Sequence, residues 1–73
     1  MSRTILDVWG ANLTERRLQL GLSQQLVAKK VGVSAASLCR WEKGVTGPTD
    51  THKMALAKVL AMDARYLFPL VAA

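Results

Sequence analysis

The sequence predicts an all-α domain, and three observations indicate it. Five short segments each begin at a Ser, Thr or Asp side chain of the kind that caps helices, and three of them end at glycine. Hydrophobic residues make up 51% of the 73 residues and recur at helical spacing. No segment alternates apolar and polar residues for long enough to predict a strand. We therefore expect one compact domain, residues 1–73, built from five helices.

The first helix is expected to begin near Ile5, because Thr4 and Asp7 have the spacing of a capping box. Gly21 then suits the end of the helix. Gly10 interrupts the segment and costs about 1 kcal/mol relative to alanine, so a later start is also open. The apolar positions at helical spacing are Leu6, Trp9, Leu13 and Leu20.

The other four helices have similar starts and ends. They are expected at 24–31 after Ser23, at 35–43 after Ser34, at 50–61 after Thr49, and at 64–68 after Asp63. Gly32, Gly44 and Pro69 mark three of their ends, and residues 69–73 form a C-terminal tail. The inner face of the fourth helix is expected to consist of Met54, Ala57, Leu60 and Ala61.

The chain has ten Lys and Arg against five Asp and Glu, a formal charge of +5. A basic surplus favours a polyanionic partner, either nucleic acid or an anionic membrane surface. No expected helix concentrates its lysine and arginine residues on one face. No apolar run approaches the roughly 20 residues that span a bilayer. We therefore expect no membrane association.

Enzyme and metal chemistry find little support in the sequence. The single cysteine, Cys39, excludes an intramolecular disulfide and a cysteine-based zinc site, and His52 has no second ligand close by. No Ser/His/Asp or Cys/His arrangement, acidic pair or phosphate loop indicates catalysis. We expect no catalytic residue, metal, cofactor or small-molecule substrate, and a reducing, cytoplasmic location.

Residues 24–43 have the pattern of a helix-turn-helix. Gly32 permits a sharp turn between two short helices, and the small Ala28 suits the point where they cross. The side chains expected to point inward and fix their angle are Val27, Val31, Leu38 and Trp41. A rigid crossing of this kind holds the second helix out to enter a DNA major groove.

Over residues 10–68 the sequence resembles the Cro and repressor-type (Xre) helix-turn-helix family. The matching residues are Leu13, Arg17, Gly21-Leu22-Ser23-Gln24, Ala28, Val31-Gly32-Val33-Ser34, Leu38, Trp41-Glu42, Gly44, Pro48, Ala57 and Leu60. The resemblance implies a five-helix, repressor-like fold and a transcriptional regulator in a bacterial or phage-infected cell. It also implies sequence-specific binding to double-stranded DNA, as a homodimer on a palindromic operator.

The resemblance and the side-chain chemistry together assign site residues. The candidates for contact with base edges are Ser34, Ala35, Ala36, Ser37 and Arg40. The candidates for contact with phosphates are Ser23, Gln24, Arg40, Lys43 and Thr46. Arg17 and Glu42 resemble a pair that joins the first helix to the third. Lys29 and Lys30 fit a phosphate contact or a solvated helix end equally well.

Several assignments concern the rest of the surface. The charges expected to face solvent are Arg16, Lys53, Lys58 and Arg65. Asp50 and Lys53 stand where the family has apolar residues, so either this end is more solvated or Met54 and Leu56 provide the apolar contacts. Either one of the two apolar segments, 5–9 or 67–71, forms a dimer interface, or both simply cover the small core. A protein-interaction module, such as an antitoxin with the same fold, is the alternative function.

Overall fold

The computed structural model describes residues 4–70, which hold five α-helices and no strand. The helices are α1 (Ile5–Gln19), α2 (Gln24–Val31), α3 (Ala35–Glu42), α4 (Asp50–Val59) and α5 (Ala64–Leu67). The all-α prediction is therefore confirmed. None of the described helices is long and apolar enough to cross a membrane.

Each helix begins at the capping side chain that the sequence predicts. The capping residues are Thr4, Ser23, Ser34, Thr49 and Asp63. At the start of α1, the N–H of Asp7 donates to Thr4 Oγ1 at 3.1 Å, and the N–H of Thr4 donates to Asp7 Oδ2 at 3.2 Å. This capping box starts α1 at Ile5, so a later start after Gly10 is wrong.

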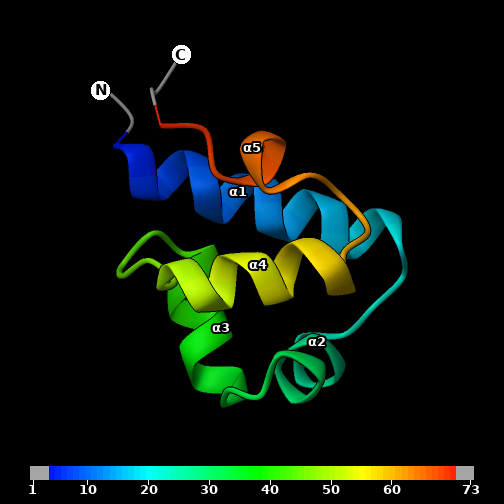
Figure 1. Cartoon of the computed structure of the whole chain (residues 1–73). Helices are drawn as coiled ribbons and strands as arrows, with labels where there is room; N and C mark the ends of the chain where they lie inside the picture. Colours follow the sequence, from blue (N-terminus) through cyan, green and yellow to red (C-terminus); the bar gives the residue numbers. More distant parts are fainter. Residues whose placement is uncertain (1–3, 71–73) are drawn as a thin grey trace.

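The five helices enclose one core. In Figure 1, α1 and α5 lie above α4, and α2 and α3 lie below it; α5 packs against both α1 and α4. α3 also packs against α1 and α2. The buried core residues are Leu13, Val27, Ala28, Leu38, Trp41, Leu56, Leu60, Leu67 and Phe68. Because all five helices contribute to this cluster, the orientation of α3 depends on the whole fold.

Gly10 marks a close approach between helices. It is buried in the middle of α1, and a Cβ at this position would lie 2.7 Å from the carbonyl oxygen of Trp41 and closer still to that of Glu42. Cβ atoms essentially never come so near to other atoms. α1 therefore packs directly on the backbone at the end of α3, a contact that only glycine permits.

For three residues, the predicted place on an apolar helix face is wrong, because their side chains are exposed. Met54 is 63% exposed and Ala61 is exposed, whereas Leu56 and Leu60 are buried. α4 ends two residues earlier than predicted, and Ala61 has a φ of +50°, so its side chain leaves the inner face. Leu20 follows the last residue of α1 and is likewise exposed. In α4 the apolar contacts thus come from Leu56 and not from Met54.

Two basic residues that were expected to face solvent instead make contacts within the folded domain. Arg16 donates from Nε to the carbonyl of Leu60 at 2.8 Å and from Nη2 to that of Ala61 at 3.2 Å. It thereby binds carbonyl groups left free at the end of α4. The side chain of Lys53 is only 18% exposed, and its Nζ lies 3.9 Å from the centroid of the Trp9 ring, a cation–π contact.

The two apolar segments near the chain ends pack against each other. Trp9 and Phe68 meet edge to face with their ring centroids 5.6 Å apart, and Trp9 Nε1 donates to the carbonyl of Pro69 at 2.7 Å. The half-buried residues beside them are Ile5, Leu6 and Val8. Leu70 remains 86% exposed, and Val71, like the last two residues of the expected tail, lies outside the described residues. Much of the apolar surface of these segments therefore covers the core.

Candidate nucleic-acid interface

α2, a tight turn and α3 form the helix-turn-helix. Gly32 has a φ of +89°, and its N–H and that of Val33 both donate to the carbonyl of Ala28 at 2.9 Å. A residue with a side chain rarely adopts this φ, so glycine makes the turn possible. Leu38 and Trp41 are buried on the inner side of α3. The turn therefore holds α3 with one face on the core and the opposite face open to solvent.

The open side of α3 and its C-cap consists of Ala36, Arg40 and Lys43, all of which are exposed. Steps of four and three residues place them on one helix face, opposite Leu38 and Trp41. This face combines one small apolar side chain with two long cationic ones. Its two cationic side chains carry donors for bases or phosphates.

The other predicted base-edge residues differ in exposure. Ser34 is exposed, but its Oγ donates to Ser37 Oγ at 3.0 Å and accepts the N–H of Ser37 at 3.1 Å. Ser37 is half-buried, and Ala35 packs partly against the core. Ala36 and Arg40 are thus the exposed candidates on α3 whose side chains take no part in capping.

Among the predicted phosphate residues, Ser23, Lys43 and Thr46 are exposed. Gln24 is half-buried, and its Nε2 donates to Glu42 Oε1 at 3.0 Å. Since a glutamine amide carries two N–H groups, the second can still reach an anion. The first turn of α2 also has backbone N–H groups without helical acceptors, an arrangement that attracts phosphate.

Glu42 connects the three helices around this site. Arg17 on α1 donates to both carboxylate oxygens, at 2.7 and 3.0 Å, and Thr14 donates at 3.1 Å alongside Gln24 of α2. The side chains of Arg17 and Glu42 are only 12% and 6% exposed. Burial raises the pKa of Glu42, but hydrogen bonds from Arg17, Gln24 and Thr14 outweigh that effect and hold the pKa below its ordinary value. The carboxylate is therefore charged at neutral pH and ties α1, α2 and α3 together.

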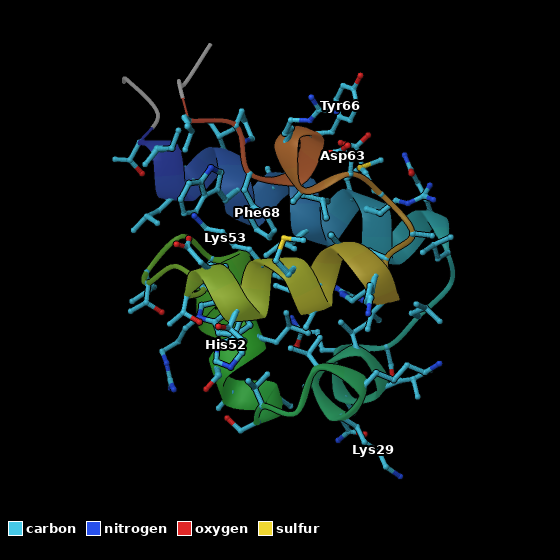
Figure 2. The ribbon with its side chains drawn as sticks, viewed as in Figure 1. Lys29, His52, Lys53, Asp63, Tyr66 and Phe68 are labelled. Carbon is cyan, nitrogen blue, oxygen red and sulfur yellow. The ribbon has the colours of Figure 1, made fainter. Side chains whose placement is uncertain are left out.

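The exposed charges of the helix-turn-helix are all of one sign. Between Ser23 and Thr46 the exposed charged residues are Lys29, Lys30, Arg40 and Lys43. The single acid of this segment, Glu42, is buried against Arg17 and contributes no open negative charge. Lys29 points away from the body of the molecule (Figure 2). The segment therefore presents a positive surface to an approaching polyanion.

Trp41 packs against His52, a residue that the sequence did not connect to the site. The ring of His52 on α4 lies on Trp41, with the ring centroids 5.3 Å apart, while Lys53 turns to the other side of α4 (Figure 2). His52 Nδ1 is buried and has no hydrogen-bond partner within residues 4–70. Across the same part of the chain, no three His, Cys, Asp or Glu side chains gather as metal ligands. His52 thus braces α3 through packing.

Comparison with known sequences identifies relatives. A helix-turn-helix family model matches residues 13–67. Repressor protein C2 of Salmonella phage P22 is 34% identical over 61 residues, which cover 84% of this chain and 28% of C2. The HTH-type transcriptional regulator DicA of Escherichia coli K12 is 33% identical over 58 residues, which cover 80% of this chain and 43% of DicA. The chain therefore spans less than half the length of each relative.

Solved structures agree with these matches. The P22 c2 repressor in complex with a synthetic operator superposes with a TM-score of 0.82 and 32% identity, covering 85% of this chain and 94% of that one. The restriction-modification controller protein C.AhdI of Aeromonas hydrophila gives a TM-score of 0.81 and 30% identity, covering 86% and 96%. Sequence and structure thus agree that this chain belongs to the Cro and repressor-type (Xre) helix-turn-helix family.

Proposed function

We propose that this chain is a sequence-specific, double-stranded DNA-binding domain of a transcriptional regulator. The observation that carries the proposal is the open face of α3, where Ala36 and Arg40 are exposed and no acidic side chain opposes an approaching phosphate. Membership in the family supports it, as does the solved complex of the P22 c2 repressor with an operator. The domain has no catalytic role in this proposal and works where the DNA is, in the cytoplasm.

In the proposed complex the N-terminal half of α3 enters the major groove. Ala36 packs against a thymine methyl group, and Ser34 at the helix start donates to or accepts from a base edge. Arg40 lies one turn further along the helix, where it binds a guanine in two-point contact or holds a phosphate. Ala35 and Ser37 flank this contact. With few long side chains at these positions, part of the specificity comes from DNA shape.

Phosphate contacts on both sides of α3 orient it in the groove. The start of α2 provides one clamp, made of Ser23, the free amide hydrogen of Gln24 and unpaired backbone N–H groups. The segment after α3 provides the other, with Lys43 and Thr46. Two such clamps fix the register of a helix on the duplex without reading its sequence.

We further propose that the domain binds a palindromic operator as a homodimer. Two recognition helices separated by about 34 Å would then meet successive major grooves on one side of the DNA. Operator half-sites should accordingly lie one helical turn apart, since a two-fold protein is matched by a two-fold site.

Binding-site selection from random duplex DNA tests the proposal. The parent chain is expected to enrich a motif, and the selection is repeated with Arg40→Ala to compare base preferences. Duplexes carrying one half of the motif then serve for titrations of the parent and Arg40→Ala at two salt concentrations. Arg65→Ala is the matched control, because it removes the same charge from an exposed residue that pairs with Asp63 on α5. Loss of one base preference makes Arg40 a reader, and uniform weakening with a smaller salt slope makes it a phosphate clamp.

Two results would contradict the proposal. One is the absence of any enriched motif, with only weak, salt-sensitive binding, which would favour a protein partner such as a toxin. The other is equal binding by the parent and Arg40→Ala at both salt concentrations, which would remove α3 from the interface.

A further inference from the structure

An apolar side chain stands open to solvent just after α3. Val45 is 63% exposed and lies in the chain between Lys43 and Thr46, the two exposed residues of the second proposed phosphate clamp. It belongs neither to the buried core nor to the half-buried side chains that pack against the core. A single exposed apolar side chain is common on a protein surface, so what matters here is where Val45 lies.

Two backbone hydrogen bonds place Val45 beside Arg40. The N–H of Gly44 donates to the carbonyl of Trp41 at 3.2 Å, and the N–H of Val45 donates to the carbonyl of Arg40 at 3.0 Å. These bonds form a Schellman motif, in which the second residue after the helix cap lies next to the residue whose carbonyl it binds. Since Arg40 is on the open face of α3, Val45 stands at the end of that face.

The loop that carries Val45 rests on α1 at two glycines. A Cβ on Gly44 would lie 3.1 Å from Cα of Asp7 and closer still to its carboxylate, and a Cβ on Gly47 would lie 2.7 Å from Cδ2 of Leu6. The loop is thus held against α1 on both sides of Val45. A side chain whose place is set before binding loses little freedom when it makes a contact.

We infer that Val45 reads a thymine through its C5-methyl group, at a base pair beyond Arg40 from the one that Ala36 contacts. The inference rests on the proposed function, in which the open face of α3 lies in the major groove. The C5-methyl of thymine is the apolar group in the major-groove pattern of the bases, so it matches an exposed apolar side chain. Ala36 stands one turn before Arg40 and Val45 follows the helix end, so apolar contacts flank Arg40 on both sides.

This role differs from that of the residues on either side of Val45. Lys43 and Thr46 carry donors that suit phosphates, which every DNA sequence presents. Val45 has no donor and no charge, so its contact should depend on the base sequence and should release no counterion. The loop after α3 would then contribute to specificity as well as to affinity.

Replacement of thymine by uracil tests the inference, because uracil lacks only the C5-methyl group. Half-site duplexes of the selected motif, each with one thymine replaced by uracil, are titrated with the parent chain and with Val45→Ala. At one position uracil should weaken binding by the parent about fourfold, the effect of one buried methyl group, and should not weaken binding by Val45→Ala. Uracil at any other thymine should affect both proteins alike.

Met54→Ala is the matched control, since Met54 is also 63% exposed. It lies two residues after His52, which packs on Trp41 of α3, and a rotation of about 200° turns it to the other side of α4. The control should bind every duplex as the parent does. Thermal unfolding shows whether each variant is folded, and Val45→Ala should unfold at the temperature of the parent because Val45 is exposed.

Salt dependence gives a second readout. Val45→Ala should weaken binding to the half-site without changing the slope of affinity against salt concentration, because no phosphate contact is lost. Lys43→Ala should instead reduce that slope by about one. A reduced slope in Val45→Ala would mean that its contact is with the DNA backbone, and would overturn the inference.

Two further results would overturn it. One is a Val45→Ala chain that binds every duplex as the parent does. The other is a Val45→Ala chain that keeps the effect of uracil at every thymine, which would place Val45 on the sugars. If the parent still selects a motif and Arg40→Ala weakens its binding, these results refute only the role of Val45. A parent that selects no motif refutes the proposed function, and the inference with it.

Discussion

Replacing Glu42 by alanine should remove a large part of the stability of this domain. The substitution leaves Arg17 without its partner at a position where only 12% of its side chain is exposed, and it removes an acceptor from Thr14 and Gln24. Breaking a buried pair by removing one partner costs about 3–5 kcal/mol. A domain of this size is stabilised by roughly 4–11 kcal/mol in total. We therefore expect a loss of about 3 kcal/mol or more, and partial unfolding at 37 °C.

Urea unfolding followed by circular dichroism measures this loss. The matched comparison is the double variant Arg17→Met/Glu42→Leu, which removes both charges and keeps apolar volume in the same place. It should be more stable than Glu42→Ala, because an unpaired buried charge costs more than a missing pair. If Glu42→Ala stays within about 1 kcal/mol of the parent, the pair contributes no more than a surface ion pair and the reasoning is refuted.

Three further outcomes follow from the fold. The pKa of Glu42 lies below its ordinary value of 4.5, so its contribution to stability is full above that pH and is lost as the pH falls through the lower folded value. The free energy of unfolding of the parent, measured against pH, should fall in this acid range. A smaller fall in Glu42→Gln would confirm that Glu42 is its origin. Gly10→Ala should destabilise by about 1–3 kcal/mol in urea despite better helix propensity, because its Cβ meets backbone carbonyls of α3; a gain would show that the helices can separate there. Trp9→Phe should cost about 1 kcal/mol by losing the bond to the Pro69 carbonyl, and unchanged stability would mean that water replaces it.

The helix starts were predictable because the interactions that define them are local. A capping side chain such as Ser23 or Ser34 binds a backbone N–H three residues later, so the signal lies within four letters of sequence. Gly32 marks the turn in the same way, through its own backbone conformation. The central helix-turn-helix could thus be placed without knowledge of the remaining fold.

The errors concern contacts between residues distant in sequence. Arg16 and Lys53 look like surface charges, and only the packed structure brings them to the end of α4 and to Trp9. Met54 has the spacing of a core residue, yet α4 turns Leu56 inward instead. Gly10 illustrates the same limit, since its neighbours Trp41 and Glu42 are supplied by α3. Periodicity defines a helix face, but the choice of face depends on what packs against it.

The positions of the candidate site could be predicted from the sequence. Which of their polar groups remain free to bind DNA was less predictable. Exposure of Ala36, Arg40 and Lys43 follows from the three- and four-residue steps of α3. The bond from Gln24 to Glu42 could not be read from the sequence, because it joins two helices through the orientation of two side chains. Such bonds decide which atoms remain free for DNA.

Mapping the DNA contact by amide chemical shifts is the most direct test of the proposed interface. The isotope-labelled chain would be titrated with a half-site duplex, which keeps dimer contacts out of the result. We expect the largest shifts at the start of α2, along α3 from Ser34 to Arg40, and at Lys43 and Thr46. Shifts concentrated on α4 and α5, or no shifts with any selected duplex, would contradict a DNA-binding face formed by α2 and α3.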